Sequence, residues 1–205
     1  HALEYYKAKA TPVARVNPSE FKAVYKEFGY DESEQIEAGP RLSYVAEPVN
    51  GLWLINIDSN IYDNNIAENY PRTEGALDQE TINWVVSKVK EGKSKGKKVI
   101  AMMHHGLIEH FKHQGVLAGE YLINDYKEVC EVFARAGLEF IFTGHAHMQD
   151  ISMRSIEGNN IYDIQTGSAI TYPCPYRTVT ITDDKFKIES HDISLKSSTT
   201  SGKQL

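Results

Sequence analysis

The stretches "VIAMMHHG" (99–106) and "FIFTGHAH" (140–147) decide the fold. Each is a continuous apolar run that ends in histidines, and runs without alternation are typical of strands covered on both faces. A helical pattern over 124–137 lies between them, so strand, helix and strand follow one another. Because ligands bind at the carboxyl ends of strands in sheets of this kind, we expect the two groups of histidines to share one edge.

Further elements are predicted on both sides of this unit. A helix over 17–30 is capped by Asn17 and places its apolar residues on one face. The segment 41–59 reads as a hairpin, and a helix over 77–92 is expected to end at Gly92. The last third alternates and turns repeatedly, as antiparallel strands do. The expected fold class is therefore mixed α/β, with two sheets, one of them mixed, and helices on the outside.

Composition limits the possible functions. The chain has 205 residues, of which 41% are hydrophobic and 24% charged, enough to bury a core over 1–195, with a frayed polar tail at 196–205. The net charge of −6 argues against a nucleic-acid polymer as partner. No apolar run reaches the roughly 18 residues that a membrane span needs. Two cysteines without a CxxC spacing do not indicate a cysteine zinc site.

The histidines form the candidate site. Alternate residues of an extended segment point the same way, so His145 and His147 are expected to converge on one ion or on two neighbouring ions. His104, at the other strand end, is the third candidate metal ligand. In an extended segment His105 points away from His104, and it either supports a ligand or faces the substrate.

Two loops are candidates for contact with a substrate. His110 and His113 lie in the loop after the first histidine group and, with His105, are candidate substrate contacts, although a solvated role is open for both. The ranges 59–76 and 107–123 contain three aromatic residues, Tyr62, Tyr70 and Tyr121. These residues are suited to stacking on a base, but they could also be ordinary loop residues. No catalytic residue is assigned.

The two histidine motifs resemble the last two motifs of the calcineurin-like metallophosphoesterases, an apolar strand ending in His-His and a strand ending in GHxH. The stretch "DIQTGSAITYPCPYRTVTI" (163–181) resembles the closing strands of that family, with its Gly-Ser turn. Upstream segments are similar to bacterial secreted or surface-attached phosphodiesterases, which implies an extracytoplasmic location. The resemblance implies the second half of a two-sheet αββα sandwich with outer helices.

The same resemblance implies a function. Members of the family hydrolyse phosphomonoesters or phosphodiesters with two divalent ions, and Fe, Mn and Zn all suit imidazole mixed with carboxylate. By motif, His104 and His145 would bind the second ion and His147 the first. The implied partner is a phosphoester small molecule or a nucleotide.

The sequence departs from the family in one large respect. The motifs DxH, GDxxD and GNH, which supply the carboxylates, are absent from the 205 residues. We therefore expect the chain to be the C-terminal part of such a domain, inactive alone and holding little or no metal. Two alternatives stay open: a mononuclear His₃ metal hydrolase, and a non-catalytic interaction module. An exposed sheet edge would favour a homodimer.

Overall fold

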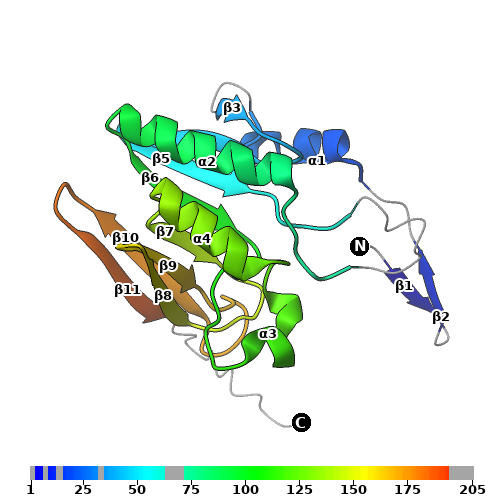
Figure 1. The fold of residues 1–205 in the computed structure, drawn as a ribbon. Coiled ribbons are helices and arrows are strands. Elements are labelled where there is room, and N and C mark those ends of the chain that lie inside the picture. The colour runs from blue at the N-terminus through cyan, green and yellow to red at the C-terminus, as the bar shows by residue number, and fades with distance from the viewer. Residues whose placement is uncertain (1–2, 7–8, 13–15, 32–34, 63–71, 194–205) are drawn as a thin grey trace, which may run out of the picture.

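The computed structural model describes residues 3–6, 9–12, 16–31, 35–62 and 72–193 and centres on one seven-stranded mixed sheet (Figure 1). Its strand order is β3-β4-β5-β6-β7-β9-β8. The bounds are β3 Gln35–Ala38, β4 Tyr44–Val49, β5 Leu52–Ile57, β6 Lys98–Met103, β7 Phe140–Thr143, β8 Asp150–Ile156 and β9 Asn159–Gln165. Neighbours from β5 through β6 and β7 to β9 are parallel, while β3–β4, β4–β5 and β8–β9 are antiparallel.

Two hairpins stand outside this sheet. β10 (Pro175–Ile181) pairs with β11 (Phe186–Asp192), and β1 (Leu3–Tyr6) pairs with β2 (Lys9–Pro12). Phe186 stacks on Phe140 with ring centroids 3.8 Å apart, so the β10–β11 hairpin packs on the large sheet. A large mixed sheet with a small second sheet and helices confirms the predicted mixed α/β class. β9 is the exception in the last third, because it runs parallel to β7.

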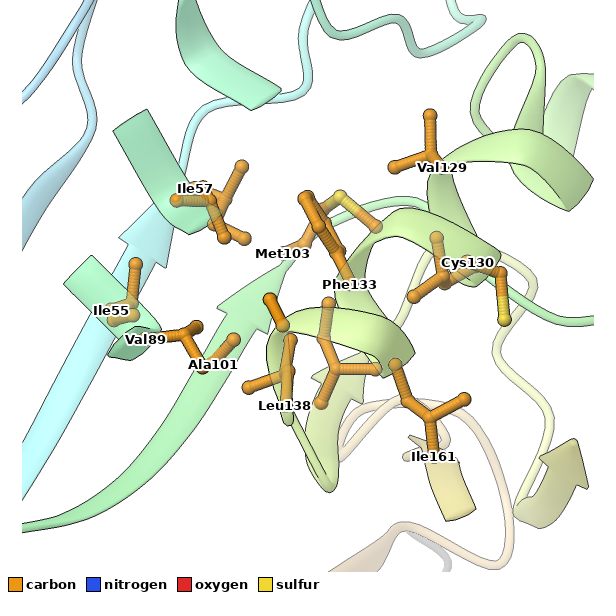
Figure 2. Close-up of a cluster of buried hydrophobic side chains, with 14 of the residues drawn as sticks. Ile55, Ile57, Val89, Ala101, Met103, Val129, Cys130, Phe133, Leu138 and Ile161 are labelled. Atoms are coloured by element: carbon orange, nitrogen blue, oxygen red, sulfur yellow. The ribbon is translucent and has the colours of Figure 1, made fainter. Parts of the chain in front are cut away.

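The helices α2 (Gln79–Ser94) and α4 (Tyr126–Ala136) cover one face of the large sheet (Figure 1). The core lies between these helices and the inward residues of β5, β6, β7 and β9, with Phe133 and Leu138 fully buried at its centre (Figure 2). The shorter helices are α1 Pro18–Val24, α3 Gln114–Leu117 and the 3₁₀ turns η1 Lys26–Phe28 and η2 Gly119–Tyr121.

Helix details differ from the sequence prediction in two places. α2 continues past Gly92 to Ser94. A Cβ on Gly92 would lie 2.6 Å from Val99 and 2.9 Å from Trp53, so this glycine allows close helix–sheet packing instead of ending the helix. α1 begins as predicted, with a capping box between Asn17 and Glu20, but it ends at Val24 and a 3₁₀ turn, η1, follows.

Several predictions concern residues outside the described ranges. The tail at 196–205 and Tyr70 both lie there. Within the described residues, no helix is long and apolar enough to cross a membrane.

Candidate metal centre

The histidine segments meet at the carboxyl ends of β6 and β7. These strands pair in parallel, with Ala101 opposite Ile141. His104 directly follows β6, and the backbone N–H of Gly144, directly after β7, donates to the His104 carbonyl at 3.0 Å. The shared edge that the sequence predicted therefore exists.

The imidazoles of His104 and His145 are in direct contact. His104 Nε2 lies 2.9 Å from His145 Nδ1, with one nitrogen donating and the other accepting, and the ring centroids are 4.6 Å apart. Burial lowers the pKa of His104, and nearby His145 and His147 lower it further. Burial and then His147 lower the pKa of His145 as well. Both rings are therefore neutral at pH 7, the form in which imidazole binds metal ions.

His147 follows on an exposed turn. After β7 the chain leaves the extended conformation, with φ of 65° at His145 and 55° at His147. We expected an extended segment that points both side chains the same way, but the observed backbone is not extended at these two residues. His147 lowers the pKa values of His104 and His145 through its charge.

His105 turns into the protein and is 1% exposed. Its Nε2–H donates to the Thr73 carbonyl at 2.9 Å, and its Nδ1 lies 2.8 Å from the Ser59 hydroxyl, which donates in return. Burial lowers the pKa of His105 to about 4, against the opposing effect of the Thr73 hydrogen bond. The structure thus places this candidate substrate contact in a supporting position, behind His104 and His145, with ring centroids 5.0 and 4.7 Å from theirs.

The loop histidines occupy two different environments. The His110 side chain is 1% exposed, with Nδ1 2.9 Å from Asp150 Oδ2 and Nε2 3.5 Å from Asp163 Oδ1. Burial alone would lower the pKa of His110, but the two carboxylates outweigh it and the net shift is upward. His113 is exposed and precedes α3 with a φ of 67°. Neither is in the contact between His104 and His145.

Two acidic residues were missed as parts of this edge. Asp58 follows β5, beside His104, and its side chain is 4% exposed. Its Oδ1 accepts from Asn60, and its Oδ2 accepts from the Tyr62 hydroxyl at 2.8 Å. Asp163, in β9, is fully buried and reaches the segments of both histidines. The sequence offered a signal for Asp163, because it stands inside the apolar strand "NIYDIQ" and carboxylates are rarely buried without partners.

The described side chains supply only part of the metal centre that the motifs imply. Among the described residues, no three His, Cys, Asp or Glu side chains gather closely enough to hold an ion. His104 and His145 are suited to one ion as a pair, and His145 Nε2 is buried without a hydrogen-bond partner. The described residues therefore do not fit a two-ion centre, which needs more ligands than this pair.

A cavity opens beside His104. It has a volume of about 360 Å³. His104 and Asp58 line its polar end, while Phe21, Tyr30 and Tyr44 line its aromatic side. A group bound in this cavity would therefore contact His104 directly.

The chain is similar in fold to solved structures. No family profile and no curated protein sequence matches the chain. The crystal structure of a dimetal phosphatase from Danio rerio superposes with a TM-score of 0.56 at 12% sequence identity. The match covers 74% of this chain and 58% of that one. At this identity the likeness establishes the fold, a metallophosphoesterase-like α/β sandwich, and this chain spans less than two thirds of the phosphatase.

Proposed function

We propose that the chain supplies the histidine part of the centre of a metal-dependent phosphoesterase. The observation that carries the proposal is the contact between His104 and His145 at the carboxyl ends of two parallel strands. The fold shared with a dimetal phosphatase supports it. The metal ligands that we propose are His104 and His145, with His147 from the adjoining turn.

The chemistry of the pair suits this role. Neutral imidazoles bind Zn²⁺, Mn²⁺ or Fe²⁺, and a bound ion polarises a phosphoester and lowers the pKa of its water. His105 stabilises the site from behind through its bonds to Ser59 and Thr73. Such second contacts orient the ligands of a metal site.

Carboxylates from outside the described residues would complete the site. Imidazoles carry no charge to offset divalent ions, and Asp58 is held by its own neighbours. We therefore propose that these 205 residues alone bind at most one ion weakly and turn over little or no phosphoester. The substrate that we propose is a small phosphoester or nucleotide, with its organic group in the cavity beside His104.

Zinc titration tests the ligand assignment. We expect weak binding of one Zn²⁺ by calorimetry, lost in His104→Ala and His145→Ala. His191→Ala is the matched control, because His191 is an exposed histidine on β11. An unchanged zinc affinity in His145→Ala would refute the proposal. Hydrolysis of bis(p-nitrophenyl) phosphate well above buffer, abolished by the same substitution, would instead show that the chain needs no further ligands.

The alternatives predict different results. A mononuclear His₃ hydrolase requires equal losses of zinc affinity on replacing His104, His145 and His147, together with measurable hydrolysis by the chain. If the chain is an interaction module that pairs through the edge strand β8 or β3, size-exclusion chromatography should show a dimer both with and without metal. A monomer would argue against that reading.

A further inference from the structure

Asp163 joins the two segments that carry the paired histidines. Its Oδ2 accepts from the backbone N–H of Leu107 at 2.6 Å and of Ile108 at 3.0 Å, just after His104. Its Oδ1 accepts from the hydroxyl of Thr143, two residues before His145. One buried carboxylate thus bonds to both sides of the site.

The strand pairing explains why this link matters. The ladder between β6 and β7 pairs Ala101 with Ile141 and Met102 with Phe142, and so it ends before either histidine. Beyond the ladder, the two segments are connected by the bond between the His104 and His145 rings, by the bond from Gly144 N–H to the His104 carbonyl, and through Asp163. A neighbouring strand, β9, thereby fixes the separation of the two chain segments.

A carboxylate suits this position better than an amide. The backbone amides of Leu107 and Ile108 and the hydroxyl of Thr143 all donate to Asp163, which is 0% exposed. Both carboxylate oxygens accept, and charge-assisted bonds are roughly twice as strong as neutral ones. The His110 imidazole, 3.5 Å away, adds a cation to the same group when protonated.

We propose that Asp163 is a positioning residue, which sets the relative placement of the His104 and His145 imidazoles. The proposal rests on the proposed function, in which these two rings share one ion. Asp163 acts through Thr143 and the 107–108 backbone and has no contact with the ion. Groups that orient metal ligands typically change metal affinity by about 10- to 100-fold when removed.

The experiment compares Asp163→Asn and Thr143→Val with the control Ile161→Val. Ile161 is equally buried on the same strand but belongs to the hydrophobic core. The first measurement is the ¹H–¹⁵N spectrum of the histidine rings in the metal-free chain. The second is zinc affinity. We expect Asp163→Asn and Thr143→Val to shift the ring signals of His104 and His145, and Asp163→Asn to weaken zinc binding about 10-fold. Ile161→Val should do neither.

Each outcome decides a separate question. Thr143→Ser restores the hydroxyl and should restore the wild-type ring signals. Unshifted ring signals in a folded Asp163→Asn variant would overturn the positioning role. If that variant does not fold, Thr143→Val makes the same test by removing a single bond, and unshifted signals there count equally against the role. Failure of the wild-type chain to bind zinc would refute the proposed function, while the metal-free ring signals would still decide the role of Asp163.

Discussion

Replacing His105 by alanine is expected to destabilise the fold far more than replacing its neighbour His104. His105 is fully buried and fills the space beside Gly75, where an added Cβ would lie 2.4 Å from its ring. Its removal leaves a cavity and strips partners from the Ser59 hydroxyl and the Thr73 carbonyl. Cavity formation after large-to-small core substitutions costs about 2–5 kcal/mol, and each unsatisfied buried polar group about 1–3 kcal/mol.

Because Ser59 can rotate and water can enter part of the space, we expect a total loss of about 3–5 kcal/mol in the free energy of unfolding. His104 is exposed, so His104→Ala should cost about 1 kcal/mol or less, the worth of its one hydrogen bond. Urea unfolding at pH 7.5, followed by tryptophan fluorescence, measures both values. His105→Gln keeps a donor for Thr73 and should lose less than His105→Ala. Equal losses for His104→Ala and His105→Ala would refute the supporting role of His105.

Three further predictions follow from single contacts. Because the pKa of His110 is raised in the folded protein, protonated His110 stabilises the fold fully below about pH 6.5, its unfolded pKa, and this stabilisation is lost as pH rises through the folded pKa. Between pH 6.5 and 8.5 the urea midpoint should therefore fall more in the wild type than in His110→Gln. Parallel curves for the two proteins would contradict this. Gly92→Ala should lower the free energy of unfolding by about 1 kcal/mol. Overpacking of the new Cβ against Val99 at 2.6 Å costs about 1–3 kcal/mol, which exceeds the helix-propensity gain of about 1 kcal/mol. A stabilised variant would show that the helix can shift. Burial raises the pKa of Cys130 to about 11, so in a Cys174→Ser background the native thiol should resist Ellman's reagent, and labelling at the unfolded rate would contradict its burial.

The elements that formed as predicted are those with local signals. The cap at Asn17 marked a helix start that the structure confirms, and the helical pattern predicted over 124–137 coincides with α4. Gly92 misled the prediction, because a glycine that ends a helix and one that packs against a strand look alike in sequence. Contact with Trp53, 39 residues away in the chain, is what separates the two cases.

The site was predictable to the level of the strand ends and no further. The continuous apolar run predicted a strand covered on both faces, but β6 turns Ala101 and Met103 inward and leaves Met102 exposed. The environment of His105 depends instead on Ser59 and Thr73, more than 30 positions away. The turn after β7 likewise follows from positive φ values at His145 and His147, which are uncommon for residues other than glycine.

Electrostatics limit what completes this site. The pKa values of His104 and His145 are lowered because burial and neighbouring imidazoles act on them together. A free carboxylate in contact with either ring would act in the opposite direction, as Asp163 and Asp150 do for His110. Glu120 already acts in this direction on His145, but burial and His147 outweigh it. A carboxylate that completes a divalent-ion site here should raise the pKa values of both histidines in the metal-free assembly.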